Sequence, residues 1–462
     1  MSKKYSWLAG AVFCGLFTCV HSVFAGGVPG TNVLNIQTMV TAGGVSFGGT
    51  FDNPDNSFTL DAGSYPNSVV AADLNGDGKV DLVCANGDDE LRGYTNNGSG
   101  GFALAFTLNV GSGRRPYAVV VADVNGDGKM DLISANNGNN TLSVYTNKSR
   151  SVYVLASMPV VGNQPYSVAA ADINGDGKME LISANRGDST LTVLTNRGNG
   201  LFGFNATYAV GGDPRCVIAA RVNGTNMDLI SANYSGANYS ASSLTVLTNK
   251  GDGTFKECST NSVGSNPRWA VAADVNGDGY LDLISANHGA ATLTVRTNTG
   301  SGGLFKFACT LDVGDSPNSV TAADVNGDGW VDLISANGDG TLSVLTNDGS
   351  GGFALSSSPY VGDTLISITA ADVNMDGGAD LIFANNDDGY LMVWLNTLIS
   401  SSLNGVAISW TTNATGFVLQ QNDDLASTNW VNVSMTPTVT NKLNQVIVAP
   451  LVDSQFYRLR HP

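Results

Sequence analysis

The stretch Asp73–Asp81, which reads DLNGDGKVD, decides the fold of this chain because five similar stretches follow it. In every copy, carboxylate or amide oxygens stand at positions one, three, five and nine, and a glycine stands at position six. The other copies are Asp123–Asp131, Asp172–Glu180, Asp274–Asp282, Asp324–Asp332 and Asp372–Asp380. A hard cation such as Ca²⁺ binds about six to eight oxygens, and a short loop supplies them only if it turns sharply, as glycine permits. The stretches therefore predict six calcium-binding loops.

The spacing of these loops predicts a repeat architecture. Counting a degenerate copy at Arg221, the first positions of the loops recur every 48 to 53 residues. A fixed period in this range is typical of a solenoid, a propeller or an array. The chain therefore contains seven sequence units.

Each unit predicts four short antiparallel strands. In the sixth unit, Ser319–Asp324 precedes the loop, and Asp332–Asn337, Thr341–Asn347 and Phe353–Val361 follow it. These segments are rich in β-branched and apolar residues and are bounded by Gly, Asn or Asp, as strands are. Because no segment of the mature chain shows a 3.6-residue apolar period, we predict an all-β fold without helices.

The ends of the repeat region predict a closed ring. The seventh unit has three strands, Ser367–Ala371, Asp380–Asn385 and Tyr390–Asn396, but no fourth. Upstream of the first unit, Phe58–Gly63 matches the end of a fourth strand. We therefore predict a seven-bladed β-propeller closed by this N-terminal strand, because the pairing removes exposed sheet edges.

The blade sequence with its DxNxDGxxD loop resembles the FG-GAP/VCBS repeat, the unit of the integrin α-subunit head and of many secreted bacterial propellers. The resemblance covers residues 50–397. It implies a Ca²⁺-bearing propeller used in extracellular recognition, with the metal loops on the lower face between the first and second strands of each blade. It does not imply one particular ligand.

The predicted metal ligands occupy positions one, three, five, seven and nine of the six intact loops, and position seven contributes its backbone carbonyl. These residues are Asp73, Asn75, Asp77, Lys79, Asp81, Asp123, Asn125, Asp127, Lys129, Asp131, Asp172, Asn174, Asp176, Lys178, Glu180, Asp274, Asn276, Asp278, Tyr280, Asp282, Asp324, Asn326, Asp328, Trp330, Asp332, Asp372, Asn374, Asp376, Gly378 and Asp380. We expect about six bound Ca²⁺ ions.

The fourth loop departs from the pattern. It runs from Arg221 to Asp228, is one residue shorter, and lacks the first and fifth carboxylates. We expect no Ca²⁺ in blade four, with the guanidinium of Arg221 bonding the oxygens of Asn223 and Asp228 in its place. The third loop ends in Glu180 and the seventh carries Met375, and both are expected to bind, the third more weakly.

The acidic composition follows from this ligand chemistry. The net charge of the 462-residue chain is −17, and loss of Lys3 and Lys4 with a signal peptide would make it −19. The six intact loops hold 18 of the 39 acidic residues, so six Ca²⁺ ions would bring the charge to about −7. Nothing in the sequence forms the basic stripe that nucleic-acid binding requires.

The N-terminal residues 1–25 have the pattern of a secretory signal peptide cleaved after Ala25, so we expect a secreted, extracellular or cell-surface protein. Residues 26–49 are Gly-rich, and no fold is assigned to them. No later segment is apolar enough to span a bilayer, and we expect a monomer.

The four mature cysteines, Cys84, Cys216, Cys258 and Cys309, lack metal-type spacing and predict no particular disulfide.

A separate small module follows the repeats. After a linker at residues 398–405, residues 406–462 predict a β-sandwich-like module whose core is marginal at this size. Its predicted strands are Val406–Thr411, Phe417–Gln421, Trp430–Val433, Val446–Ala449 and Phe456–Leu459.

Aromatic and cationic residues gather at one predicted face of blades two to five. The start of each first strand and the turn between the second and third strands should lie near the central channel, opposite the metal loops. The candidate ligand-binding residues there are Arg115, Tyr117, Tyr166, Arg186, Arg215, Tyr234, Arg268, Trp269 and His288. Tyr, Trp and Arg dominate binding energies, and arginine suits carboxylate or sulfate. We hypothesise a site for a glycan, an acidic polymer or a surface protein. Alternatively, these side chains pack between blades or cap strands.

A second repeated residue is predicted to be structural. An asparagine ends the second strand of every unit, and we expect its amide to bond the backbone of the adjacent turn. These residues are Asn86, Asn136, Asn185, Asn233, Asn287, Asn337 and Asn385.

Three functions are compatible with these features: an adhesion- or lectin-like recognition module, a secreted polysaccharide-acting enzyme such as a lyase, and a purely structural cell-surface protein. We assign no catalytic residue, because no recognisable pair of carboxylates lies outside the loops and histidine is nearly absent. We favour the recognition module, with metals that stiffen the blades.

Overall fold

The computed structural model describes residues 57–224, 226–234 and 242–396, and six strands between residues 406 and 460. The chain forms two compact units, Gly48–Leu398 and a second unit that combines residues 1–47 with 399–462. The described residues contain strands, turns and bends but no helix, which confirms the all-β prediction. Accordingly, none of these residues belongs to a helix that could cross a membrane.

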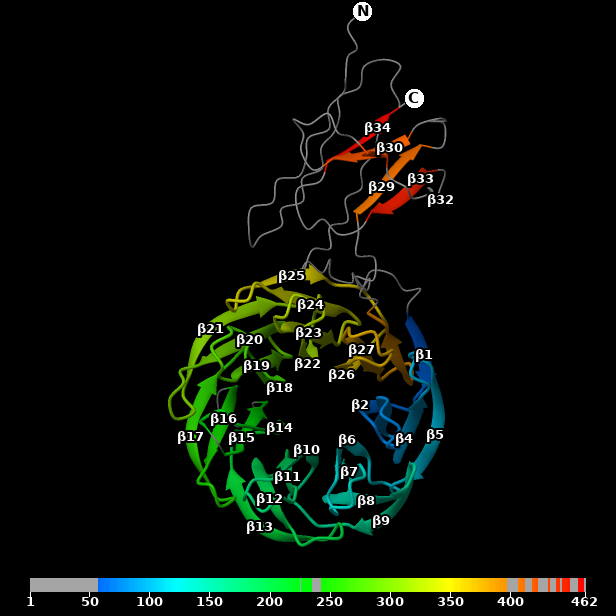
Figure 1. The fold of residues 1–462 in the computed structure, drawn as a ribbon. Helices are drawn as coiled ribbons and strands as arrows, with labels where there is room; N and C mark the ends of the chain where they lie inside the picture. The colour runs from blue at the N-terminus through cyan, green and yellow to red at the C-terminus, as the bar shows by residue number, and fades with distance from the viewer. Residues whose placement is uncertain are drawn as a thin grey trace, which may run out of the picture. The chain divides into compact units, whose positions relative to one another are not determined.

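The unit Gly48–Leu398 is a seven-bladed β-propeller (Figure 1). In blades one to six, four consecutive strands pair antiparallel in chain order. Blade one consists of β2 (Pro66–Ala72), β3 (Asp81–Asn86), β4 (Glu90–Asn96) and β5 (Phe102–Asn109). Blade two consists of β6 (Pro116–Ala122), β7 (Asp131–Asn136), β8 (Thr141–Ser149) and β9 (Val152–Ser157). Blade three consists of β10 (Pro165–Ala171), β11 (Glu180–Asn185), β12 (Thr190–Asn196) and β13 (Phe202–Ala209).

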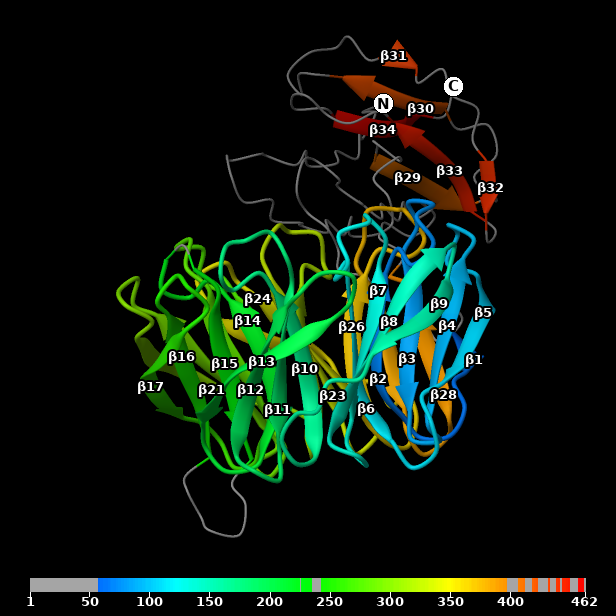
Figure 2. The ribbon, with the colours of Figure 1, turned by 90° about the horizontal axis from the view of Figure 1, so that it is seen from below.

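The same arrangement continues in the next three blades (Figure 1), and Figure 2 shows the structure turned by 90° from that view. Blade four consists of β14 (Pro214–Ala220), β15 (Asp228–Asn233), β16 (Ser243–Asn249) and β17 (Phe255–Ser262). Blade five consists of β18 (Pro267–Ala273), β19 (Asp282–Asn287), β20 (Thr292–Asn298) and β21 (Phe305–Asp312). Blade six consists of β22 (Pro317–Ala323), β23 (Asp332–Asn337), β24 (Leu342–Asn347) and β25 (Phe353–Ser357).

Blade seven joins both ends of the repeat region. It consists of β26 (Leu365–Ala371), β27 (Asp380–Asn385), β28 (Tyr390–Trp394) and, as its outermost strand, β1 (Ser57–Asp61). Strand β1 pairs antiparallel with β28, from Ser57 opposite Trp394 to Asp61 opposite Tyr390. The predicted closure by an N-terminal strand is therefore confirmed.

The core lies between neighbouring blades. The second strand of each blade is buried at all six positions, as in Asp131–Asn136, because both faces of its sheet are covered. One of the resulting clusters joins Val83 and Leu91 of blade one to Val119 and Leu132 of blade two. Truncating such a leucine to alanine costs about 2–5 kcal/mol, so apolar packing between blades is a major source of stability.

Each first strand carries a β-bulge next to its start. In β14 the pairing register shifts between Pro214 and Cys216, so Arg215 is the extra residue of the bulge. The same shift occurs in all seven blades. A bulge redirects a side chain, and these first strands neighbour one another around the axis. The extra residues are Asn67, Tyr117, Tyr166, Arg215, Arg268, Asn318 and Ile366.

The second unit contains two three-stranded antiparallel sheets. One has the order β29-β33-β32 and the other β31-β30-β34. Their strands are β29 (Val406–Thr411), β30 (Val418–Asn422), β31 (Val431–Asn432), β32 (Thr438–Thr440), β33 (Leu443–Val448) and β34 (Phe456–Arg460). All five predicted segments coincide at least in part with a strand, and β32 was not predicted.

Candidate functional site

Each predicted metal loop connects the first and second strands of its blade. In blade two, the loop begins at Asp123, directly after β6, and its last residue, Asp131, is the first residue of β7. The resemblance placed the loops between these two strands, and the structure agrees.

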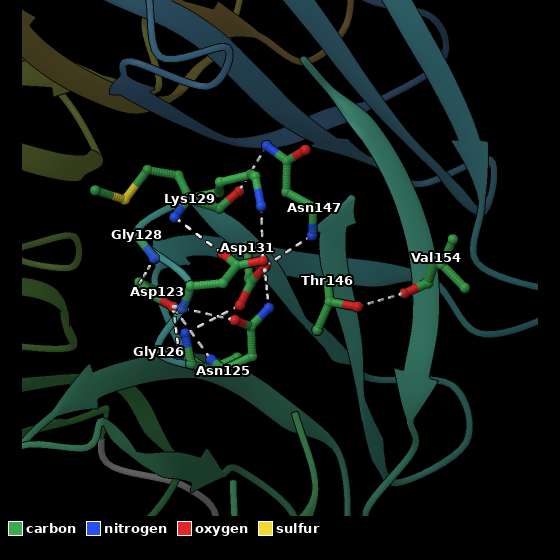
Figure 3. A network of polar contacts seen from close by, with 12 residues as sticks. Asp123, Asn125, Gly126, Gly128, Lys129, Asp131, Thr146, Asn147 and Val154 are labelled. Atoms are coloured by element: carbon green, nitrogen blue, oxygen red, sulfur yellow. Dashed lines mark hydrogen bonds and ion pairs between the residues drawn. The ribbon is translucent and has the colours of Figure 1, made fainter. Parts of the chain in front are cut away.

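The first aspartate organises the loop around its carboxylate. Asp123 Oδ1 accepts a 2.7 Å hydrogen bond from the backbone N–H of Gly126, and its Oδ2 accepts one of 2.7 Å from Gly128 (Figure 3). Both glycines have φ of +79°, a conformation that costs other residues energy. Asp127 Oδ1 in turn accepts a 3.0 Å bond from the N–H of Lys129. These bonds hold the carboxylates of positions one and five in a turned-back loop.

The ninth residue has a structural task that the sequence reasoning missed. Asp131 is fully buried, its Oδ2 accepts a 3.0 Å bond from the N–H of Val124, and its Oδ1 accepts a 2.7 Å bond from the N–H of Asn147 (Figure 3). The equivalent acid makes both bonds in every blade, including Glu180 and Asp228. This acid therefore ties the loop to the third strand.

Burial disfavours the charged form of these ninth-position acids. It raises the pKa of Asp332 to about 6 and that of Asp380 to about 7, although the two backbone N–H donors act in the opposite direction. The carboxylates at positions one and five of the same loops raise the pKa further. A cation in the loop would favour the charged form.

An asparagine at or near the end of each third strand connects neighbouring blades. The side-chain amide of Asn147 donates to the carbonyl of Met130 in its own loop at 3.2 Å and to the carbonyl of Leu74 in the loop of blade one at 2.9 Å. The same pair of bonds recurs in all seven blades. The bonding residues are Asn96, Asn147, Asn196, Asn249, Asn298, Asn347 and Asn396. An asparagine recurs in the sequence near the end of each third strand, and this repetition is the signal from which the bonds between blades could have been predicted.

The donor set of the loops fits a hard cation. Each intact loop offers carboxylate and amide side-chain oxygens and a backbone carbonyl, which are the kinds of ligand that Ca²⁺ binds. Among the described residues, the carboxylates of Asp172, Asp176 and Glu180 bring their oxygens within 4.8 Å of one another. In that loop, the Lys178 ammonium lies 3.7 Å from the carboxylate of Asp176. The third loop, which we expected to bind more weakly, thus holds the tightest acidic group in the described part of the chain.

The fourth loop corrects one expectation. Arg221 is exposed, and no hydrogen bond or ion pair joins it to Asn223 or Asp228 within the described part of this loop. The oxygens of Asp228 are already used, because they accept bonds from the N–H groups of Val222, Asn223 and Asn249. Backbone donors, not a guanidinium, satisfy this carboxylate.

The asparagines at the ends of the second strands differ from expectation in blades two to six. Asn136 Nδ2 donates to the hydroxyls of Thr141 at 3.1 Å and Ser143 at 2.9 Å, and its Oδ1 accepts from the hydroxyl of Ser134 at 2.9 Å. The equivalent asparagines of blades three to six bond side-chain hydroxyls in the same way. In blade seven, Asn385 Oδ1 does accept a 3.2 Å bond from the backbone N–H of Asp388 in the adjacent turn, as predicted. The four described cysteines are free thiols.

Six of the predicted ligand-binding residues do come together. The rings of Tyr117 and Tyr166 lie 4.7 Å apart, and the Arg215 guanidinium lies 5.5 Å from the Tyr166 ring. The same guanidinium lies 3.5 Å from the Tyr234 ring, and Arg268 lies 5.9 Å from that ring on the neighbouring blade. Finally, the rings of Tyr234 and His288 are 6.1 Å apart. We call Tyr117, Tyr166, Arg215, Tyr234, Arg268 and His288 the mouth cluster.

The mouth cluster has a positive electrostatic environment. Asp213 pairs with Arg215 at 3.2 Å and with Arg186 at 2.8 Å. Burial lowers the pKa of Arg268, and the neighbouring Arg215 lowers it further. Burial and these two guanidiniums together lower the pKa of His288 to about 4, so its imidazole is neutral at pH 7.

Arg186 joins the mouth cluster through Asp213, but two other predicted residues lie elsewhere. Trp269 is partly buried against the apolar clusters that blade five forms with both of its neighbours. Arg115 is exposed in a left-handed conformation with φ of 49°, and its backbone N–H bonds Asp89 at 2.7 Å. The bulge explains this division, because it redirects one residue per first strand, and Trp269 follows the extra residue Arg268.

Comparison with known proteins identifies the repeat. The FG-GAP-like repeat family matches residues 73–134, 123–183, 172–226, 225–285, 274–335 and 324–383, which together extend over most of the chain. No curated protein matches the whole sequence significantly.

Several solved structures have a similar fold. BBS1N, crystallised in complex with ARL6DN, is 14% identical with a TM-score of 0.53, and the alignment covers 74% of this chain and 96% of BBS1N. Virginiamycin B lyase from Staphylococcus aureus is 12% identical with a TM-score of 0.50, covering 73% and 97%. A lectin from Agrocybe aegerita that recognises non-reducing terminal N-acetylglucosamine is 20% identical with a TM-score of 0.46, covering 70% and 87%. At these identities, the similarity to BBS1N and to the lyase shows the fold alone.

Proposed function

This chain belongs to the FG-GAP-like repeat family, and we propose that it is a secreted, calcium-binding β-propeller that recognises a glycan outside the cell. The mouth cluster is the observation that carries the recognition role. It combines half-buried tyrosine rings, which can stack on sugars, with arginine side chains, which donate several hydrogen bonds from a rigid fork. Its residues vary from blade to blade on an otherwise repetitive frame, and such positions commonly determine specificity.

The calcium ions have a structural task in this proposal. Positions one, three, five, seven and nine of the six intact loops would hold them, as in Asp123, Asn125, Asp127, Lys129 and Asp131. A bound ion would neutralise the mutual repulsion of these carboxylates. Blade four lacks the carboxylates of positions one and five, so we propose that it binds no ion.

Comparing thermal unfolding in calcium and in chelator tests the metal assignment. Extracellular calcium sites typically have dissociation constants of about 10⁻⁴ to 10⁻³ M, so about 10 mM Ca²⁺ should stabilise the protein by roughly 1.4 to 2.7 kcal/mol per site. Elemental analysis should find about six ions per chain. Identical melting curves in both buffers would remove the calcium assignment.

A glycan array tests recognition directly. The wild-type protein should bind a subset of glycans, and a variant with Tyr166, Arg215 and Arg268 replaced by alanine should lose that binding while it remains folded. A suitable control is Arg296→Gln, since Arg296 bonds the carbonyl of Ser262 at 2.9 Å in blade five outside the mouth cluster. Unchanged binding by the folded triple variant would contradict the proposed site. Binding to a surface protein in place of a glycan would redirect the proposal.

A lyase is the second candidate, because the mouth cluster places tyrosine, arginine and histidine side chains together. General-base catalysis is most effective when the pKa of the base lies near the working pH. His288, whose pKa is lowered to about 4, is a weak base at neutral pH, which favours recognition over catalysis. Release of unsaturated products from pectic or sulfated polymers, followed by absorbance, would establish the lyase instead.

Export is proposed from the N-terminal sequence. N-terminal sequencing of the protein recovered outside the cell should begin at Gly26, after cleavage behind Ala25. Retention of the uncleaved chain inside the cell would contradict this part of the proposal.

A further inference from the structure

We infer that the mouth cluster contains an anion-binding site between blades four and five, in which Arg215 and Arg268 receive a carboxylate or sulfate group of an acidic glycan. This inference rests on the proposed recognition function and specifies its ligand class. It follows from the way the bulge residues contact one another around the channel.

The bulge residues form a belt of contacts from blade to blade. Asn67 donates to the carbonyl of Pro116 at 3.3 Å, which links blade one to blade two. The rings of Tyr117 and Tyr166 then contact each other at an interplanar angle of 42°, and Tyr166 lies beside Arg215. Beyond the two arginines, Asn318 donates to the carbonyl of Leu365 at 2.7 Å, which links blade six to blade seven.

One junction of this belt brings two like charges together. Arg215 and Arg268 are successive bulge residues, and both guanidiniums lie near the ring of Tyr234. The proximity is electrostatically significant, because the charge of Arg215 lowers the pKa of Arg268. Adjacent like charges in a partly desolvated place are unfavourable unless an opposite charge joins them.

Arg268 has no internal counterion in the described part of the protein. None of the ion pairs of these residues includes it, and its Nη1 donates to the neutral amide oxygen of Asn318. Its Nε is buried without a hydrogen-bond partner. The guanidinium thus keeps a positive charge that no carboxylate of the described residues neutralises, and an Nε donor without a partner.

Arg215 also has a side-chain N–H donor without a partner, although a carboxylate lies beside it. Its side chain is only 8% exposed and pairs with Asp213 through Nη2, but its Nε is also buried without a partner. The same carboxylate of Asp213 also forms an ion pair with Arg186. One carboxylate therefore balances three guanidiniums, and since His288 is neutral at pH 7, the region keeps a charge of about +2.

A carboxylate or sulfate group complements the charge of these two guanidiniums. Oxyanions accept two parallel hydrogen bonds from a guanidinium, and such charge-assisted bonds are about twice as strong as neutral ones. The rings of Tyr166 and Tyr234 would contact the sugar that carries the anion. The site consequently selects acidic sugars over neutral ones.

Anion titrations without any glycan test the site itself. Sulfate and acetate are titrated against the calcium-loaded protein at constant ionic strength with chloride, and binding is followed by calorimetry and by melting temperature. We expect saturable binding of at least one of the two oxyanions. Arg268→Gln should weaken it at least tenfold, Arg268→Lys should retain part of it, and the control Arg296→Gln should leave it unchanged. Equal binding by wild-type and the Arg268→Gln variant would overturn the inference.

Asp213→Asn gives a result that a purely structural role does not produce. Removing the internal carboxylate frees Arg186 and Arg215, so the affinity for the added oxyanion should rise severalfold even if the protein becomes less stable. An unchanged or lower affinity would contradict the inference.

Matched oligosaccharides distinguish this inference from the proposed function. Uronate-containing, sulfated and neutral oligosaccharides of equal length are compared on wild-type and the Arg268→Gln variant. If the wild-type protein prefers one acidic series and the Arg268→Gln variant does not, the result supports both the anion site and glycan recognition, and it identifies the oxyanion. Equal binding of all three series supports recognition but overturns the anion site. If sulfate or acetate binds but no oligosaccharide does, the anion site stands and the proposed glycan recognition fails.

Discussion

The side-chain amide of Asn96 donates a 2.7 Å hydrogen bond to the carbonyl of Val373, which lies 277 residues further along the chain. Asn96 ends the third strand of blade one, and Val373 is the second residue of the metal loop in blade seven. The equivalent bond joins every other pair of adjacent blades. Each metal loop is thus fixed both by its own blade and by the next one, so that order in the loops supports the closed ring.

The first prediction concerns this link. Asn96→Ala should lower the free energy of unfolding by about 1–3 kcal/mol, because the buried carbonyl of Val80 loses its amide donor and that of Val373 loses one of two. Urea denaturation in chelator measures the effect. The control is Asn205→Ala, since Asn205 is exposed on β13 and should change stability by less than about 0.5 kcal/mol. Equal effects of both substitutions would mean that the link does not stabilise the ring.

The second prediction separates the two tasks of the loop acids. Asp380→Asn should destabilise the protein by about 2–4 kcal/mol even in chelator, because its carboxylate accepts bonds from the N–H groups of Val373 at 2.8 Å and Asn396 at 2.7 Å. Asp376→Asn, at the exposed fifth position, should have little effect in chelator but should reduce the stabilisation by Ca²⁺. Denaturation of both variants with and without calcium measures the difference.

Blade four supplies the matched control for this experiment. Asp228 makes the same bonds as Asp380, but its loop lacks two of the ligand positions. Asp228→Asn should therefore destabilise the protein equally in calcium and in chelator. A calcium-dependent effect at Asp228 would indicate that the fourth loop also binds an ion.

The sequence was sufficient for the fold because its information is periodic. The loop motif and its spacing predict strands, blade number and closure, and the similarity of Phe58–Gly63 to a fourth strand predicts β1. Hydrogen-bond partners were not predictable in this way. The role of Asn147 depends on which carbonyl of the neighbouring blade lies beside it, and Trp269 differs from Arg268 only in its position relative to a bulge. Such details depend on three-dimensional register, which a residue pattern alone does not fix.

The third prediction concerns the altered turn of the seventh loop. Met375 has φ of 64° at the position where the other intact loops have glycine, such as Gly76 with φ of 78°. A non-glycine residue in this conformation costs roughly 1–2 kcal/mol. Met375→Gly should therefore raise the free energy of unfolding by about 1 kcal/mol, as measured by denaturant unfolding, because Met375 is 62% exposed and loses little packing. A destabilised variant would show that the side chain contributes contacts that outweigh the strain.

The fourth prediction concerns ring closure. Deleting Ser57–Asp61 should expose the edge of β28 and remove Phe58 and Leu60 from the core cluster of blades seven and one. Unpaired edges associate with other chains, so the shortened protein should form oligomers and melt at a lower temperature. Light scattering and calorimetry measure both effects, and substitution of exposed Thr59 by Ser, which keeps the strand, is the control. A monomeric deletion variant with an unchanged melting temperature would show that β1 is dispensable.

The fifth prediction is a pH dependence at the mouth cluster. The pKa of His288 falls from 6.5 to about 4 in the folded state, through burial and then through Arg268 and Arg215. Between these values the unfolded chain binds a proton that the folded chain does not, so the stabilising contribution is fully present above pH 6.5 and is lost as the pH falls towards 4. His288→Gln removes this dependence, so its melting temperature should decrease less than that of wild-type between pH 7 and pH 5. Differential scanning calorimetry in chelator compares how the melting temperatures of the two proteins depend on pH. The carboxylates contribute equally to both, so the difference reports on His288. Parallel profiles would show that His288 does not experience the field of the two arginines, and the positive character of the mouth cluster would then have to be abandoned.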